Sequence, residues 1–355
     1  MRNRSWRRAA SPVVLAAVTC VVPAIVAAAP AAAAGGGAGA CTTVSIPVAL
    51  TQGGPANQTV SAEYCTPGGR ATGIDVLVAG ATYSHIYWDF PVDAGTYNFT
   101  DKLLAAGQAV LAFDKIGTGS SSRPPSTDVT FSSDVYVLHQ LIGWARSSGY
   151  AQVNVIGHSM GSFTAVYDAA TWPSDPTRLV LTGFLNTITP GGEEGLSTGL
   201  YPANQDPIFS GDGLDSGYLT TTPGTREALF YDPADVNPAV VAYDEAHKDT
   251  VTASELSSLV PVLDAPAAGN AANGVTAPVL IVDGQEDALM CVGGAVNCES
   301  WPAMHAFEAP YFSSAASLTT ISIPNTGHDV ALSPTADISA AAIEAWLALT
   351  PVKDG

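Results

Sequence analysis

The stretch VNVIGHSMGS, residues 153–162, places a serine between two glycines, directly after four residues typical of a buried strand. A serine on a sharp turn between a strand and a helix crowds the backbone around it, and only residues without a Cβ atom tolerate that crowding. Gly157, Ser159 and Gly161 fit this arrangement, and the helical pattern SFTAVYDAA follows. The turn would expose the Ser159 hydroxyl at a helix N-terminus, where backbone N–H groups stabilise an oxyanion. The motif predicts a catalytic nucleophile, and the alternative is a small residue in a tight turn.

A serine hydroxyl becomes a strong nucleophile only when a histidine takes its proton and an acid orients that histidine. On this type of turn the partners follow along the chain in the order serine, acid, histidine. The stretch VLIVDGQEDAL ends a strand at Gly284, and Asp287 stands three residues later, in the loop at the carboxyl end of that strand. Asp283 and Glu286 compete for the same role, but Asp283 falls within the strand or at its tip. We therefore predict Asp287 as the acid.

The loop after the last strand should supply the base. ISIPNTGHDVAL contains His328, which follows an apolar strand and precedes the closing helix. The remaining histidines are better explained as surface residues or hydrogen-bonded core residues; they are His85, His139, His158, His247 and His305. The predicted triad is therefore Ser159, Asp287 and His328.

The elements that must position this triad alternate between strands and helices. Short continuous apolar runs predict strands that are covered on both faces; they begin at Ile74, Ala109, Val153 and Arg178 and recur at 278–284 and 319–324. Helical patterns lie between several of these runs, and the last one, ISAAAIEAWLAL, closes the chain. Before the first run, TTVSIPVAL and QTVSAEYC alternate apolar and polar residues around a turn, as in an antiparallel hairpin. We predict an α/β fold with a mostly parallel, doubly wound sheet and an N-terminal hairpin.

The first forty residues have the pattern of a secretory signal peptide. Four arginines precede an Ala/Val-rich run at 13–29, and the small residues PAAAAGGGAGA follow. A retained membrane anchor is the alternative, but Pro23 interrupts the run and alanine is a weak hydrophobe. The paired Arg7 and Arg8 leave both the general secretory and the twin-arginine export routes open. We expect a secreted protein whose folded part begins near Cys41.

The charge of the chain excludes some classes of partner. Of the 13 Lys and Arg residues, four lie in residues 1–40, which contain no Asp or Glu. The remaining nine face 32 acidic side chains, so removal of the signal peptide changes the formal charge from −19 to −23. Such a surface repels nucleic acids and anionic lipids, so we expect neither nucleic-acid binding nor a stable membrane anchor after processing. The oligomeric state is left open.

Four cysteines remain after the predicted cleavage, because Cys20 leaves with the signal peptide. An even number in an exported chain indicates two disulfides, with three possible pairings. Proximity in the sequence favours Cys41 with Cys65 and Cys291 with Cys298. A zinc site is the alternative, but the cysteines lack paired C-x-x-C spacing and have no nearby pair of histidines.

From Cys41 to the end, the chain resembles a secreted α/β-hydrolase of the serine type, similar to esterases and lipases. The resemblance rests on VLVAGATYSHIYWD, LAFDKIGTGSSSRP, VIGHSMG, LIVDGQED and PNTGHD. In the family a His-Gly pair ends the first of these strands, and the residue after the glycine donates a backbone N–H to the oxyanion. Here Ala79 replaces the histidine. The resemblance implies Ala81 and Met160 as the oxyanion donors, with Thr82 as a rival to Ala81, and a structural role for the loop that contains Lys115.

The resemblance also implies a domain organisation and an activity. Residues 1–40 would be the signal peptide, 41–186 and 275–355 the two parts of the hydrolase core, and 187–274 an inserted cap whose aromatic residues line an acyl or alcohol pocket. We expect a hydrolase of carboxylic esters or lactones that needs no metal or organic cofactor. Its substrate would be a small-molecule or lipid-like ester. A peptidase or amidase with the same triad is the nearest alternative, and a non-catalytic ligand-binding relative is a more distant one.

Overall fold

The computed structural model describes residues 39–263 and 265–351. The predicted signal peptide, with Cys20, lies outside the described residues except for its last two positions. Within the described part, no helix combines the length and the hydrophobicity that crossing a membrane would require.

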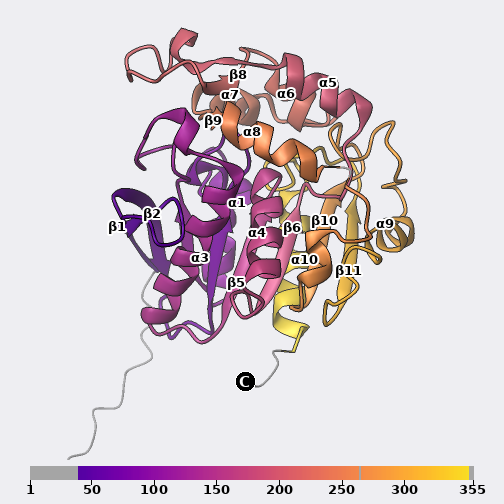
Figure 1. The fold of residues 1–355 in the computed structure, drawn as a ribbon. Coiled ribbons are helices and arrows are strands. Elements are labelled where there is room, and N and C mark those ends of the chain that lie inside the picture. The colour runs from indigo at the N-terminus through magenta and orange to yellow at the C-terminus, as the bar shows by residue number, and fades with distance from the viewer. Residues whose placement is uncertain (1–38, 264, 352–355) are drawn as a thin grey trace, which may run out of the picture. The chain divides into compact units, whose positions relative to one another are not determined.

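A large mixed sheet of eight strands forms the centre of the structure (Figure 1). The strands run in the order β1-β2-β4-β3-β5-β6-β10-β11. Their bounds are β1 (Ala40–Val48), β2 (Gln58–Thr66), β3 (Ile74–Val78), β4 (Ala109–Phe113), β5 (Val153–His158), β6 (Arg178–Thr182), β10 (Val279–Gly284) and β11 (Leu318–Ile323). Strand β2 pairs antiparallel with β1 and β4, whereas the pairs from β4 to β11 are parallel. The predicted fold class, including the N-terminal hairpin, is confirmed.

The strands next to the predicted nucleophile are buried along their whole length. Every residue of β3, β4, β5, β6 and β10 is buried, which matches the continuous apolar runs in the sequence. The helices that pack around the sheet are α1 (Ala94–Tyr97), α2 (Phe99–Ala105), α3 (Phe131–Ser147), α4 (Met160–Thr171), α9 (Trp301–Glu308) and α10 (Ala336–Leu349). Helices α3 and α4 pack against each other, and α10 packs against α2 and β10. Because parallel strands begin and end at the same two edges of a sheet, the loops after β5, β10 and β11 meet at one edge.

The chain between β6 and β10 forms a group of short elements that lies above the large sheet in Figure 1. It contains a second, smaller sheet, whose three strands are antiparallel and run in the order β7-β8-β9. The strands are β7 (Leu200–Pro202), β8 (Tyr218–Thr221) and β9 (Val251–Thr252); the helices are α5 (Pro190–Thr198), α6 (Arg226–Phe230), α7 (Pro238–Ala246) and α8 (Ala253–Leu259). Five 3₁₀ turns complete the described elements: η1 (His85–Tyr87), η2 (Ser126–Asp128), η3 (Ala203–Gln205), η4 (Val260–Val262) and η5 (Ala271–Gly274). The division into a core and a cap at 187–274 remains a prediction.

Two disulfides join the cysteines that are close in sequence. Cys41 bonds to Cys65 between directly opposed positions of β1 and β2, with an S–S distance of 2.02 Å. Cys291 bonds to Cys298 in the loop after β10, also at 2.02 Å. The proposed pairing is confirmed, and it leaves no free thiolate for a zinc site among the described residues.

Candidate active site

Ser159 occupies a strained turn between β5 and α4. Its backbone angles are φ 53° and ψ −124°, a conformation that residues with a side chain rarely adopt. A Cβ atom on Gly157 would lie 2.6 Å from the Ser162 Cα, and one on Gly161 would lie 2.2 Å from the Val78 carbonyl oxygen. Both positions therefore require glycine, as the sequence pattern predicted. The turn leaves Ser159 half-buried at the start of α4.

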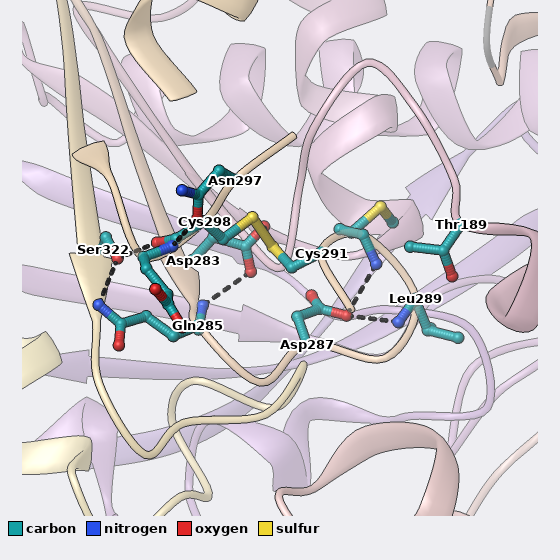
Figure 2. Close-up of a disulfide and its surroundings, with 12 residues drawn as sticks. Thr189, Asp283, Gln285, Asp287, Leu289, Cys291, Asn297, Cys298 and Ser322 are labelled. Atoms are coloured by element: carbon teal, nitrogen blue, oxygen red, sulfur yellow. Dashed lines mark hydrogen bonds between the residues drawn. A yellow bond between two sulfur atoms is a disulfide. The ribbon is translucent and has the colours of Figure 1, made fainter. Parts of the chain in front are cut away.

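Asp287 and His328 come together from the loops that follow β10 and β11. The Asp287 Oδ2 lies 2.7 Å from the His328 Nδ1. The other carboxylate oxygen of Asp287 accepts hydrogen bonds from the backbone N–H groups of Leu289, at 2.7 Å, and Met290, at 3.0 Å (Figure 2). Both side chains are buried. The carboxylate is therefore held from both sides, and it fixes the orientation of the imidazole.

The two competing acids are placed differently. Glu286 is exposed. Asp283 is buried near the end of β10, where it accepts the backbone N–H of Gly284 at 2.9 Å and approaches the Cys291 sulfur (Figure 2). Burial, and next the charge of Asp287, raise the pKa of Asp283 well above its usual value. Of the three candidates, only Asp287 is hydrogen-bonded to His328 in the described structure.

Opposite effects act on the pKa of each member of the Asp287–His328 pair. Burial favours neutral Asp287, but the charge and hydrogen bond of His328 outweigh burial and lower the pKa of Asp287. Burial favours neutral His328, but the charge and hydrogen bond of Asp287 outweigh it and raise the pKa of His328 above 6.5. The pair therefore favours an imidazolium beside a carboxylate, the form that a histidine adopts after it has taken a proton.

Ser159 and His328 line the same pocket. The His328 Nε2 is buried and has no hydrogen-bond partner among the described residues. No hydrogen bond joins Ser159 Oγ to this nitrogen in the described structure, although such bonds often tighten only when substrate is bound. The pocket thus contains a hydroxyl and an imidazole nitrogen without a partner, from two loops more than 160 residues apart in sequence.

The rest of the pocket is mostly apolar. Its apolar lining residues are Ala81, Met160, Phe163, Ile188, Leu196, Leu200, Phe230, Leu256, Leu259, Leu263, Leu289 and Met290. Seven of these twelve residues come from 187–263, so that segment covers one side of the pocket. The expectation that aromatic residues of this segment line the pocket is wrong for most of them, since Phe230 alone does so among its described residues. Tyr231 binds Asp244, Tyr243 packs on Phe90, and Phe209 and Tyr218 belong to a small separate apolar cluster.

The loop after β3 passes next to Ser159. Ala81 and Thr82 both line the pocket, and the side chain of Ser159 lies against Gly80, where an added Cβ would be only 3.0 Å from the Ser159 Cβ. Within the described chain, no hydrogen-bond acceptor faces the backbone N–H of Ala81, Thr82 or Met160. Thr82 has a φ of 62°, a left-handed conformation that turns the chain sharply at this point. These N–H groups remain available to a ligand.

A buried polar network, which the sequence analysis missed, clamps this loop to the inserted segment. Arg226 binds Asp244 through two hydrogen bonds of 2.8 Å and donates to the Thr82 hydroxyl at 3.0 Å. The Tyr83 hydroxyl donates to Asp244 at 3.2 Å and also to Asp329, the residue after His328. All of these side chains are buried. One sequence signal could have found the network: Arg226 and Lys248 are the only basic residues in 187–274, so acidic partners were to be expected for both.

Four of the other five histidines, all but His305, have a side-chain hydrogen-bond partner among the described residues, as expected for surface or core residues. His158 lines the pocket, but its Nε2 is bound to Asp329 at 3.0 Å, and burial, followed by the charge of His328, lowers its pKa well below 6.5. His85 and His139 bind Asp114 and Asp175. Lys115 is buried in an ion pair with Glu255 at 3.0 Å and does not line the pocket with Ser159, in line with a structural role.

Comparisons with known proteins agree with this architecture. Residues 76–341 match the model of the alpha/beta hydrolase family, and the chain belongs to that family. It is 31% identical over 80 residues to the abhydrolase domain-containing protein abhd-5.2 of Caenorhabditis elegans, a match that covers 22% of this chain and only 18% of the length of that relative.

Solved structures share the fold at low sequence identity. An esterase from Thermogutta terrifontis aligns with a TM-score of 0.58 at 17% identity, over 86% of this chain and 98% of the esterase. A monoacylglycerol lipase from Paleococcus ferrophilus aligns with a TM-score of 0.53 at 18% identity, over 80% and 97% of the two chains. An enol-lactonase from Burkholderia xenovorans aligns with a TM-score of 0.53 at 16% identity, over 82% and 97%. At these identities the likeness supports the fold alone.

Proposed function

We propose that the protein is a secreted serine hydrolase that cleaves a carboxylic ester or lactone through an acyl-serine intermediate. The observation that carries the proposal is the position of His328: one ring nitrogen is bound to Asp287, and the other, without a partner in the described part of the chain, borders the pocket that contains Ser159. This is the arrangement that a general base for a serine hydroxyl requires.

In the proposed reaction, Ser159 Oγ attacks the carbonyl carbon of the ester while its proton passes to the His328 Nε2. Asp287 stabilises the imidazolium that results, and the backbone N–H groups of Met160 and of Ala81 or Thr82 bind the oxyanion. The tetrahedral intermediate collapses when the proton on His328 passes to the departing alcohol. Water then attacks the acyl-serine while His328 takes its proton. The second tetrahedral intermediate collapses when this proton passes to Ser159 Oγ, which releases the acid and restores the serine. No step needs a metal or an organic cofactor.

The apolar lining of the pocket supports an uncharged acyl chain as the group next to Ser159. Leucine side chains of 187–263 face Phe163, Leu289 and Met290 across the pocket, and aliphatic walls of this kind gain free energy by burying apolar surface. We propose that residues 187–274 act as a cap that closes this pocket. Export through the N-terminal signal peptide is part of the proposal, and the two disulfides support it because such bonds persist in oxidising compartments.

The test is covalent labelling of the folded protein with a fluorophosphonate probe, followed by hydrolysis of p-nitrophenyl esters of increasing chain length and of a peptide-amide panel. We expect labelling of the wild type, no labelling of Ser159→Ala, and ester turnover that far exceeds amide turnover. A folded wild-type protein that the probe does not label would contradict the proposal and favour a binding protein. Faster cleavage of amides than of esters would instead identify a peptidase or amidase.

A further inference from the structure

Three side chains at the C-terminal half of α4 form a second polar cluster outside the pocket. His139 lies on α3, Asp168 on α4, and Asp175 in the loop between α4 and β6. One donor atom from each residue lies within 4.8 Å of the other two. We propose that His139, Asp168 and Asp175 bind a divalent transition-metal ion and that this ion stabilises the packing of α3 and α4.

The state of Asp168 is the observation that points to a ligand. Its side chain is completely buried, and no donor among the described residues reaches either carboxylate oxygen. Of the described groups, only the Asp175 carboxyl lies close enough to share a proton with Asp168. A carboxylate in such surroundings is strongly unfavourable unless a cation or a proton neutralises it. The nearby Arg146 does not do so, because its guanidinium donates to the backbone carbonyls of Ala151, Ser174 and Asp175.

The types of ligand indicate the class of ion. One imidazole and two carboxylates suit Zn²⁺ or Mn²⁺ better than Ca²⁺, which prefers oxygen ligands alone. The His139 Nδ1 now lies 2.5 Å from the Asp175 Oδ2, as a hydrogen bond. Two atoms bound to one ion at about 2.0–2.2 Å lie roughly 3 Å or more apart, so these two side chains must separate by a fraction of an ångström when the ion enters.

The surroundings of the cluster allow an ion to enter from solvent and restrict how far His139 and Asp175 can move. The His139 side chain is 33% exposed and that of Asp175 is 11% exposed, which leaves a path from solvent and room for water ligands. The His139 ring stacks on Trp172 with the ring centroids 4.0 Å apart, and the backbone N–H of Asp175 donates to the Trp172 carbonyl. The ring plane and the loop are therefore already held near the geometry that an ion needs.

The ion would connect two helices and a loop at the end of α4 that is distant from Ser159. Helix α4 has 12 residues, so Asp168 lies more than two helical turns from its first residue. We therefore expect the ion to affect stability without taking part in catalysis, and the inference does not depend on the proposed hydrolase activity.

The experiment uses the purified protein after removal of metal with a chelator. Zn²⁺ or Mn²⁺ is added back, and both the bound metal per chain and the midpoint of thermal unfolding are measured. We expect one ion per chain and a rise of the midpoint by roughly 5 °C at an ion concentration about 100-fold above the dissociation constant. Asp168→Asn should abolish both effects while it keeps the size of the side chain. His139→Asn, at a partly exposed position, should weaken binding at least tenfold and serves as the second variant.

Asp212→Asn is the matched control, because Asp212 is an exposed carboxylate that pairs with Arg123 and lies outside the cluster. It should bind the ion as the wild type does. Burial, followed by the charge of Asp175 and a hydrogen bond with it, raises the pKa of Asp168 well above its usual value, so a proton shared with Asp175 is the competing way to neutralise it. A wild-type protein that binds neither ion, or one that Zn²⁺ and Mn²⁺ stabilise no more than they stabilise Asp168→Asn, would overturn the inference in favour of that proton.

Discussion

Two histidine–carboxylate pairs of the same length lie on the two sides of the central strand β5. In one, the His328 Nδ1 is 2.7 Å from Asp287, beyond β10; in the other, the His85 Nδ1 is 2.7 Å from Asp114, directly after β4. In both pairs the pKa of the histidine is raised and that of the aspartate is lowered, because the hydrogen bond and charge of each partner outweigh the effect of burial. By bond length and by the direction of the pKa shifts, the pairs are alike.

The surroundings of the second ring nitrogen separate the two pairs. The His328 side chain is 1% exposed, and its Nε2 borders an apolar pocket beside Ser159. The His85 side chain is 26% exposed and does not line that pocket. A short histidine–aspartate bond therefore says little about catalysis by itself. In the proposed mechanism, the decisive features are a serine on a strained turn and an apolar pocket in which the second ring nitrogen can take the serine proton.

The largest expected effect comes from removing each imidazole in turn. His328→Asn should lower kcat for a p-nitrophenyl ester by about 10⁴-fold or more, because the serine loses its base. His85→Asn, the matched control, should leave kcat within about twofold and lower the free energy of unfolding by about 1–3 kcal/mol, because Asp114 loses a buried partner. Steady-state kinetics and chemical denaturation measure both. An equal loss of kcat in the two variants would contradict the assignment of His328–Asp287 as the catalytic pair and His85–Asp114 as a structural pair.

The next effect concerns the carboxylates. Asp287→Asn should reduce kcat by about 10³- to 10⁴-fold, since an amide neither holds the required tautomer of His328 nor stabilises its charged form. Asp283→Asn is the control at the end of β10: burial, and next the charge of Asp287, raise the pKa of Asp283 and favour its uncharged form, so an uncharged amide should change kcat only a few-fold. If Asp283→Asn is the damaging substitution and Asp287→Asn is not, Asp283 is the acid.

The pH dependence of kcat/KM gives a smaller effect of defined sign. The base must be unprotonated to accept the serine proton, so the rate should rise with pH as His328 loses its proton. Because Asp287 raises the pKa of His328, the midpoint of this rise should lie above 6.5, with about a tenfold loss for each pH unit below it. A midpoint well below 6.5, or the same midpoint in Asp287→Asn, would contradict the proposed coupling.

The smallest expected effect comes from the two disulfides, one on each side of the sheet. Cys41 and Cys65 are 24 residues apart and join β1 to β2, whereas Cys291 and Cys298 are 7 residues apart and close a small loop shortly after Asp287. Loop-closure entropy predicts a stabilisation of about 3.5 kcal/mol for the first and about 2.5 kcal/mol for the second.

Replacing each cysteine pair by serines should give opposite rankings in two measurements. Loss of the Cys41–Cys65 bond should lower the unfolding free energy more and leave kcat unchanged. Loss of the Cys291–Cys298 bond should lower it less but reduce kcat several-fold, because Cys291 donates its backbone N–H to the Asp287 carbonyl at 2.9 Å. If loss of the Cys41–Cys65 bond changes kcat, or loss of the Cys291–Cys298 bond does not, then the effect of a disulfide on kcat does not depend on its distance from the pocket.

Much of the fold was predictable because its signals are local. The runs beginning at Ile74, Ala109 and Val153 are apolar throughout, and a strand covered on both faces has that composition. The turn at Ser159 was equally clear, since the two glycines stand at fixed positions beside it. Cysteines that are close in sequence did pair, because a short loop is easily closed.

The features that the sequence did not reveal depend on contacts between distant residues. Tyr83 contacts Asp329, 246 positions away, and no local pattern announces such a bond. The aromatic residues of the inserted segment illustrate the same limit. Tyr231 is fully buried with its hydroxyl on Asp244, and only its tertiary neighbours decide that it faces this carboxylate and not the pocket. Aromatic residue type was a poor guide to the pocket walls, where leucine is the commonest residue.

The burial of Arg226 and Lys248 determines the surface charge of residues 187–274 and therefore how this segment interacts with an anionic product. With both basic side chains of 187–274 enclosed, the exposed ionisable groups of its described residues are acidic apart from His247; they include Glu193, Glu194, Asp212, Asp215 and Glu227. In the proposed reaction a neutral ester yields a carboxylate anion, and the acidic surface of this segment is unfavourable for binding that anion. Inhibition by the released acid should therefore be weak at low ionic strength and should increase with added salt, because salt screens charges beyond about 10 Å.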